Sequence, residues 1–173
     1  MATTVRIPLT EYLQTTYRPD REYVDGEARV RNVGKWEHAR VHWLLAAWFG
    51  AHEKEWDIIG STGQRVQTGR NIRVPDLVVL KPGPQPDVLV DPPLLVIEIL
   101  SPDDSYSETQ EKARDYQVMG VETVWLIDPK TRTGRMCSGA DWSASSLLVV
   151  AGTALYVDLD VLFGQLVPPQ PAG

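Results

Sequence analysis

Residues 93–128 read PLLVIEILSPDDSYSETQEKARDYQVMGVETVWLID, and their pattern is the clearest indication of the fold. The two ends of this stretch, 93–100 and 121–128, are almost wholly apolar, which is typical of strands buried on both faces. The polar middle, 105–119, predicts a helix that starts at a capping serine and ends at Gly120. A helix between two apolar strands predicts a right-handed crossover that joins parallel neighbours.

The sequence on either side of this stretch predicts further helices and strands. Apolar residues at spacings of three and four predict a long helix over 35–55, and Asp-Gly at 25–26 predicts a hairpin over 21–31. The order of strands and helices predicts an α/β (α+β) fold in which helices flank a central sheet. We expect a single domain over 1–166 and a disordered, proline-rich tail over 167–173.

Composition excludes several classes of protein. The chain has 173 residues, 43% of them hydrophobic, so it is long enough for a core and too apolar to be disordered. A single cysteine, Cys137, excludes an internal disulfide and a cysteine-based zinc site. The sequence has neither an apolar run long enough to span a membrane nor a recognisable signal peptide, so we expect a cytoplasmic protein.

Charge gives a weaker indication about partners. The net charge of −6 argues mildly against a constitutive nucleic-acid binder, because phosphate contacts need Lys and Arg. Residues 1–81 are slightly basic, however, and the acidic excess lies in 82–173. A basic partner region could therefore exist in the first half of an acidic chain.

Two carboxylates occur inside apolar segments. Glu98 interrupts the run 94–100, and Asp76 follows a proline and opens the run 77–80. A buried ionised carboxylate costs several kcal/mol unless it is paired or binds a cation. Two acids on adjacent strands can converge on one hard cation such as Mg²⁺. The structural alternatives are a turn-capping role for Asp76 and a buried ion pair with Arg or Lys for Glu98.

Other polar residues have both a functional and an ordinary interpretation. Lys112 lies on the helix after the Glu98 strand and could reach the carboxylates, although most helix lysines are exposed. Three arginines precede or flank the Asp76 strand and could grip a phosphate backbone, or they could be ordinary surface residues: Arg65, Arg70 and Arg73. His38 and His42 share a helix face, but no third zinc ligand is evident.

A family resemblance enters with four ordered segments. They are YVDGE (23–27), VPDLVVL (74–80), LLVIEILSPDD (94–104) and K-x3-Y-x3-GV-x3-WLIDP (112–129). Together they resemble the restriction-endonuclease-like family of bacterial proteins within the PD-(D/E)XK nuclease superfamily, over nearly the whole chain. The resemblance implies a mixed central β-sheet flanked by helices and cleavage of phosphodiester bonds with Mg²⁺ or Mn²⁺.

The resemblance also implies roles for individual residues. Asp76 and Glu98 would be metal ligands, and the carbonyl of Ile99 could supply a further oxygen. The superfamily usually has a lysine two positions after the second acid, where this chain has Leu100. Lys112 looks like its displaced replacement and would stabilise developing negative charge or orient the attacking water.

Three more residues take provisional roles from the same resemblance. Glu27 is a candidate for the extra acid that many superfamily members bring from the N-terminal region, or else a polar hairpin residue. His38 resembles the family's histidine on this helix and would line the cleft. Tyr116 would either touch the site or simply pack, and packing is favoured.

Three functions from different classes remain open at this point. The leading one is a metal-dependent endonuclease that acts on DNA, with a homodimer favoured because a double-strand cut needs two active sites. The second is a non-catalytic relative that binds a nucleic acid or a protein, which the missing lysine at position 100 and the acidic charge favour. The third is a hydrolase of a nucleotide or another small phosphoester.

Overall fold

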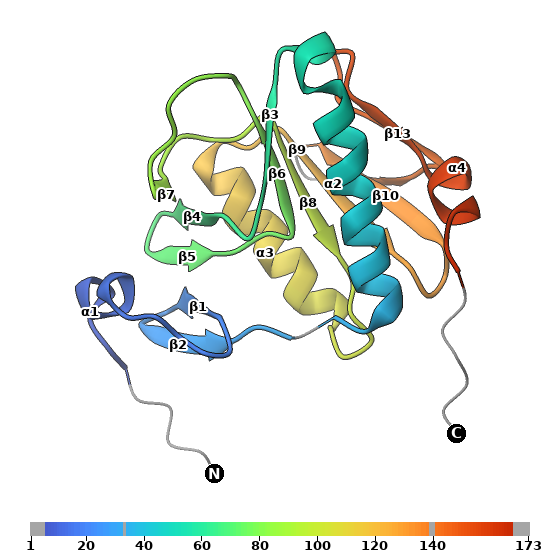
Figure 1. The fold of residues 1–173 in the computed structure, drawn as a ribbon. Helices are drawn as coiled ribbons and strands as arrows, with labels where there is room; N and C mark the ends of the chain where they lie inside the picture. Colours follow the sequence, from blue (N-terminus) through green and yellow to red (C-terminus); the bar gives the residue numbers. More distant parts are fainter. Residues whose placement is uncertain (1–5, 33, 139–140, 168–173) are drawn as a thin grey trace.

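The computed structural model describes residues 6–32, 34–138 and 141–167 (Figure 1). Within these ranges the helices are α1 (Leu9–Gln14), α2 (Trp36–Trp56), α3 (Tyr106–Met119) and α4 (Leu159–Gly164). The elements predicted around residues 93–128 are all present, and so are the hairpin and the long helix. Apart from Val167, the predicted tail lies outside the described residues.

A six-stranded mixed sheet forms the centre of the fold. Its strands, in spatial order, are β11 (Asp141–Ala144), β10 (Thr133–Ser138), β9 (Thr123–Asp128), β8 (Leu95–Ile99), β6 (Leu77–Leu80) and β3 (Ile59–Thr62). The pair β8 and β9 is parallel and is joined through α3, as the apolar–polar–apolar pattern predicts. The other neighbours pair antiparallel. The predicted mixed sheet flanked by helices is therefore confirmed.

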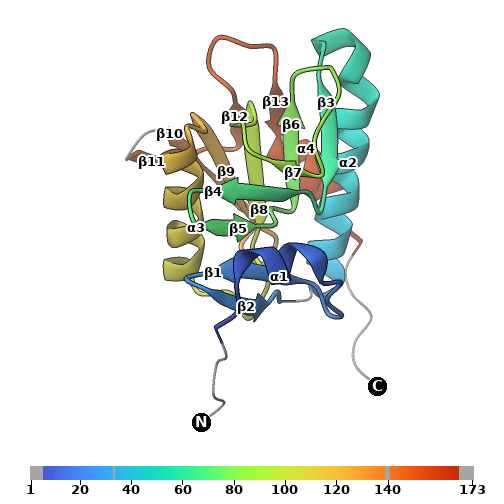
Figure 2. The same cartoon turned by 90° about the vertical axis from the view of Figure 1, so that its left-hand side faces the viewer.

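Two smaller sheets accompany it. The first has the order β2 (Glu27–Val30), β1 (Arg21–Val24), β5 (Asn71–Arg73), β4 (Arg65–Thr68) and β7 (Val88–Leu89), and the second pairs β12 (Leu147–Val149) with β13 (Tyr156–Asp158). Figure 2 shows the short strands of the five-stranded sheet crossing in front of the central sheet, between α3 and α2. This placement brings residues of β1 and β5 against α3.

The two faces of the central sheet have different covers. On one face α2 packs its buried residues Val41, Leu45 and Phe49 against Leu95, Ile97 and Ile99 of β8. On the other face Val96 belongs to a second cluster with Ala113 and Tyr116 of α3. Side chains alternate along a strand, so Glu98 shares the α3 face with Val96. The alternation thus directs the one acid of β8 toward the helix that carries Lys112.

Helix α3 has defined ends. The Ser105 side chain accepts a hydrogen bond from the Glu108 N–H at 3.2 Å, and the Glu108 carboxylate accepts one from the Ser105 N–H at 3.1 Å. This reciprocal pair is a capping box. Gly120 ends the helix with φ at 105°, a left-handed conformation that favours glycine. These ends fix which residues of α3 face the sheet. Among the described residues, no helix is long and apolar enough to cross a membrane.

Candidate active site

Asp76 and Glu98 lie at the same end of two neighbouring inner strands of the central sheet, Asp76 just before β6 and Glu98 near the end of β8. Strands β6 and β8 run antiparallel with Leu77 opposite Ile97, so the register continued by one residue sets Asp76 opposite Glu98. Both residues are buried, each with 6% of its surface exposed. The Ile99 N–H donates a hydrogen bond to Asp76 Oδ2 at 2.8 Å. The two acids that interrupt apolar segments of the sequence therefore meet around one peptide group.

Arg31 and His38 flank the Asp76 carboxylate. Arg31 approaches Oδ1 at 3.3 Å, and His38 Nε2 lies 3.4 Å from Oδ2. Burial would raise the pKa of Asp76, but hydrogen bonding and charge from His38, the Ile99 N–H and Arg31 outweigh it and leave the pKa lowered. Asp76 is consequently an ionised carboxylate near neutral pH, as a ligand for a hard cation must be.

The surroundings of Glu98 stabilise its negative charge less well than those of Asp76 do. The Tyr116 hydroxyl donates a hydrogen bond to Oε1 at 2.6 Å, and Lys112 Nζ lies 3.8 Å from Oε2. Burial raises the pKa of Glu98 to about 7; Asp76 and Glu22 raise it too, while Lys112 and Tyr116 act in the opposite direction. The existing partners thus compensate the negative charge of Glu98 only in part, and an added cation would favour its ionised form.

Lys112 bridges two carboxylates. Its Nζ lies 3.4 Å from Glu22 Oε1 as well as 3.8 Å from Glu98 Oε2. Burial lowers the pKa of Lys112, but the negative charges of Glu98 and Glu22 overcome that effect and raise it. The structure therefore brings Lys112 to the acids rather than leaving it exposed on the helix.

Glu22 of β1 is a member of the cluster that the sequence does not reveal. It is 5% exposed and accepts a hydrogen bond from the Val74 N–H at 3.0 Å. Arg73 binds its other oxygen, with the guanidinium Nη1 3.2 Å from Oε2. A buried acid so close to a lysine and a second acid belongs to the same electrostatic unit as Glu98.

The sequence suggests that Arg73 contacts a phosphate backbone, but in the structure this arginine pairs with carboxylates of the protein itself. Its side chain is 5% exposed, and its guanidinium also lies 2.6 Å from Asp115 and 3.0 Å from Glu111 on α3. Carboxylates from β1 and α3 therefore occupy the arginine and tie the small sheet to the helix. Arg73 acts inside the fold, where its three guanidinium nitrogens donate to Asp115, Glu22 and Glu111.

The other candidates from the first half lie apart from the cluster. Glu27 is on the hairpin and pairs with Arg29 at 3.3 Å, and within the described parts of the chain no ion pair or hydrogen bond joins it to the acids or to Lys112. Arg65 stacks over the Tyr12 ring, 5.0 Å from its centroid, and Arg70 is exposed in the turn between β4 and β5. The N-terminal region thus contributes Glu22, five residues before Glu27.

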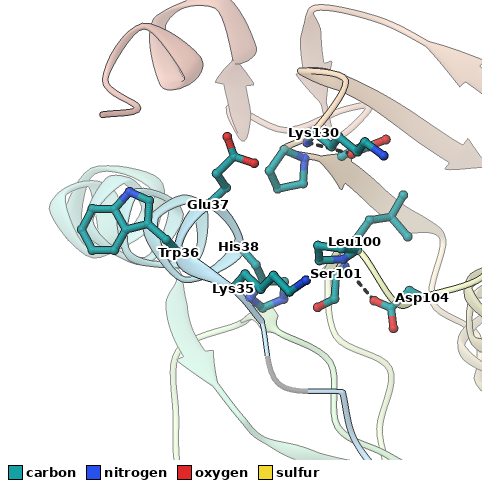
Figure 3. Close-up of a pocket in the computed structure, with 11 residues that line it drawn as sticks. Lys35, Trp36, Glu37, His38, Leu100, Ser101, Asp104 and Lys130 are labelled. Atoms are coloured by element: carbon teal, nitrogen blue, oxygen red, sulfur yellow. Dashed lines mark hydrogen bonds between the residues drawn. The ribbon is translucent and has the colours of Figure 1, made fainter. Parts of the chain in front are cut away.

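Two hollows adjoin the acids. One of about 240 Å³ is lined by Asp76, Arg31, His38 and His42, among others. The other, of about 330 Å³, lies between the start of α2 and the ends of β8 and β9 (Figure 3). His38 lines both, which agrees with the cleft-lining position that the sequence predicts for it. Both hollows therefore reach His38, a residue that contacts the acid Asp76.

The donor set suits a cation that keeps water or substrate ligands. Over the described ranges, no group of three or more His, Cys, Asp or Glu side chains is arranged to hold a metal ion. A Mg²⁺ ion is commonly bound through only one or two carboxylates, with water and phosphate oxygens completing its shell. Two buried acids at one strand end therefore fit Mg²⁺ and do not fit a closed structural zinc site.

A mixed sheet with paired acids and a lysine at one edge is an arrangement suited to metal-assisted phosphodiester hydrolysis. Residues 9–150 match the model of the Uma2 family, described as "Putative restriction endonuclease", and the chain belongs to that family. The family resemblance noted from the sequence is thereby confirmed, and at the family level the chain is a nuclease.

A solved structure shows the same fold. It is a crystal structure described as a putative nuclease belonging to DUF820 from Anabaena variabilis, with a TM-score of 0.81 and 22% sequence identity. The similarity covers 91% of this chain and 98% of the other. No curated protein matches the chain.

Proposed function

We propose that this protein is a metal-dependent endonuclease that hydrolyses phosphodiester bonds of DNA. The observation that carries the proposal is the convergence of buried Asp76, buried Glu98 and Lys112 at one edge of the central sheet. Family membership supports the nuclease class, and the slightly basic first half of the chain supports a nucleic-acid substrate. A cytoplasmic homodimer remains a prediction from the sequence.

Asp76 and Glu98 would hold the cation, Mg²⁺ or Mn²⁺, and the Ile99 carbonyl is a further candidate ligand. When bound, such a cation supplies Lewis-acid chemistry, lowering the pKa of a coordinated water and offsetting charge on the phosphoryl group. The protein prepares the two carboxylates for this task. The Ile99 N–H fixes Asp76, and the Tyr116 hydroxyl fixes one oxygen of Glu98.

Lys112 would act on the substrate itself. Its raised pKa keeps the ammonium protonated near neutral pH, so it can stabilise negative charge that develops on the phosphoryl oxygens. Glu22 would help to position that ammonium, since its Oε1 lies 3.4 Å from Lys112 Nζ. Arg73 in turn pairs with Glu22. Two linked ion pairs, from Arg73 to Glu22 and from Glu22 to Lys112, would therefore restrict the otherwise flexible lysine side chain.

A second candidate function rests on the surroundings of Asp76. Arg31 and His38 already contact its carboxylate, and Leu100 stands where the superfamily usually has a lysine. These features favour a non-catalytic member of the fold, in which protein cations replace the metal ion. Such a protein would bind a nucleic acid or a protein partner without cleaving it.

Metal dependence separates the two candidates. With Mg²⁺ or Mn²⁺, we expect the protein to convert supercoiled plasmid DNA to nicked or linear forms, and EDTA to return cleavage to background. The same ions should raise the melting temperature, since a ligand at 100 times its Kd stabilises a protein by about 2.7 kcal/mol. A protein that neither cleaves DNA nor gains thermal stability with either ion would be the non-catalytic candidate.

Lys112→Met tests the displaced lysine. We expect the cleavage rate to fall by about 10²- to 10³-fold, the loss typical of removing one group that stabilises transition-state charge. Leu100→Lys in the Lys112→Met background should restore part of the rate, because position 100 shares a strand face with Glu98. Lys81→Met, at an exposed position, is the matched control. Unchanged cleavage by Lys112→Met would remove the lysine from the mechanism.

A further inference from the structure

A pocket of about 330 Å³ lies beside the acids and has no role in the hydrolysis described above. We call it the strand-end pocket; its lining comes from the start of α2 and from the segments that follow β8 and β9, and consists of Lys35–His38, Leu100–Pro102, Asp104 and Asp128–Lys130. The parallel strands β8 and β9 end at this edge. Carboxyl ends of parallel strands are a common place for ligands in α/β proteins.

The walls of the strand-end pocket combine apolar surface with lysines. Leu100, Pro102 and Pro129 supply apolar surface, and Trp36, with 53% of its surface exposed, stands beside them. Lys35 and Lys130 are exposed and, in the described part of the chain, neither ammonium takes part in an ion pair within 4.0 Å. Figure 3 shows side chains of α2 on one side of the space and those following β8 and β9 on the other.

Two of the acids that line the pocket, Asp104 and Asp128, already accept hydrogen bonds from the protein. Asp104 accepts hydrogen bonds from Asn32 Nδ2 at 2.6 Å and from the Ser101 N–H at 2.8 Å. Asp128 accepts from the Lys130 N–H at 2.9 Å and from the Thr131 hydroxyl at 2.8 Å. These bonds engage both carboxylates in shaping the loops. Lys35, Lys130 and Glu37 are left to meet a ligand.

The strand-end pocket adjoins the acid pair through His38 and Leu100. His38 lines it and lies 3.4 Å from Asp76 Oδ2. Leu100 directly follows Ile99, whose N–H binds the same carboxylate. A chain whose phosphodiester lies at Asp76 and Glu98 would therefore carry its neighbouring nucleotide to this pocket.

We propose that the strand-end pocket takes the base of one unpaired nucleotide next to the phosphodiester to be cleaved, with Lys35 and Lys130 facing the flanking phosphates. This rests on the proposed nuclease function and narrows its substrate to single-stranded or locally unpaired DNA. The volume is near the lower end of the range of about 300–1,000 Å³ typical of small-molecule sites. The apolar walls suit the faces of a base, Glu37 can accept a hydrogen bond from an exocyclic amino group, and lysine is a common phosphate ligand. A paired base would have to leave its stack to enter.

Binding measured without cleavage tests this assignment. A fluorescently labelled 12-nucleotide single strand and its blunt duplex would be titrated by anisotropy in Ca²⁺, with gels to verify that the DNA stays intact. We expect the wild type to bind the single strand at least about tenfold more tightly than the duplex, since each unpaired base gains stacking that a duplex withholds. Leu100→Trp, which fills the pocket, should remove most of that preference.

The salt dependence of binding tests the proposed phosphate contacts of Lys35 and Lys130. The double variant Lys35→Ala/Lys130→Ala should lower the slope of log K against log salt by about 0.7 for each phosphate of a single strand that the lysines no longer neutralise. Lys81→Ala, another exposed lysine, should leave the slope unchanged. Thermal melting would establish that each variant is folded, and if Leu100→Trp is not, the salt slope of the lysine variant decides.

The outcomes separate this inference from the proposed function. Equal affinity for single strand and duplex, with an unchanged salt slope in the lysine variant, would overturn the pocket assignment even if the protein cleaves DNA. A pocket-dependent preference for single strands in a protein that cleaves no DNA would uphold the binding site and overturn the nuclease proposal.

Discussion

Asp76→Asn is expected to reduce metal-dependent DNA cleavage to background. The substitution keeps the shape of the side chain and an oxygen that can accept the Ile99 N–H, but it removes the negative charge that a hard cation needs. It also leaves the positive Arg31 beside a neutral amide. Plasmid cleavage and the metal-induced rise in melting temperature should therefore disappear together.

The control for this variant is Asp91→Asn. Asp91 is exposed and precedes β8, so it lies at the opposite end of that strand from Glu98. We expect wild-type cleavage and a wild-type response to Mg²⁺. If Asp76→Asn retained cleavage equal to that of Asp91→Asn, the acid pair could not be the catalytic centre, and the hydrolysis would have to be located elsewhere.

The sequence predicts the proximity of Glu98 and Lys112, because the two residues lie on consecutive elements of the chain. Glu98 stands out because six apolar residues surround it, and a strand of that kind is buried whatever the rest of the fold does. Lys112 follows on the next helix, which must pack back onto the sheet to join parallel strands. Both predictions depend on local pattern and one chirality rule, and the geometry brings the two residues within 3.8 Å.

Glu22 is a buried acid of the site that no local sequence pattern predicts. It lies in the polar stretch REYV, where nothing in the periodicity marks an acid as buried. Its burial depends on Arg73, which is 51 positions away in the chain and reaches it only because β1 and β5 pair in the five-stranded sheet. The sequence pattern does not predict that second sheet, so it reveals neither the hidden acid nor the internal role of Arg73.

The surroundings of Asp76 illustrate the same limit. A family pattern predicts His38 in the cleft, but its contact with the carboxylate, and that of Arg31, depends on where the end of β2 and the start of α2 lie relative to Asp76. Neighbouring sequence does not determine these positions. The structure therefore adds Arg31 and His38 to an acid pair that the sequence suggests but does not settle.

Arg73→Met is expected to lower the free energy of unfolding by about 3–5 kcal/mol, the typical cost of removing one partner from a buried ion pair. The guanidinium contacts Glu22, Asp115 and Glu111, and its removal would leave Glu22 buried with Lys112 as its remaining cation. Urea denaturation monitored by tryptophan fluorescence would measure the loss. Arg70→Met, at an exposed position, should change stability by no more than about 0.5 kcal/mol.

A double variant distinguishes a paired network from simple packing. If the cost in Arg73→Met comes from the uncompensated charge of Glu22, then Glu22→Leu/Arg73→Met should be more stable than Arg73→Met alone, because replacing both partners by apolar groups can be nearly neutral. If the cost comes from the packing of the arginine side chain, the second substitution should add to the first. A loss of less than about 1 kcal/mol in Arg73→Met would mean that α3 and the small sheet hold Glu22 without the arginine, and that Lys112 is positioned by Glu98 instead.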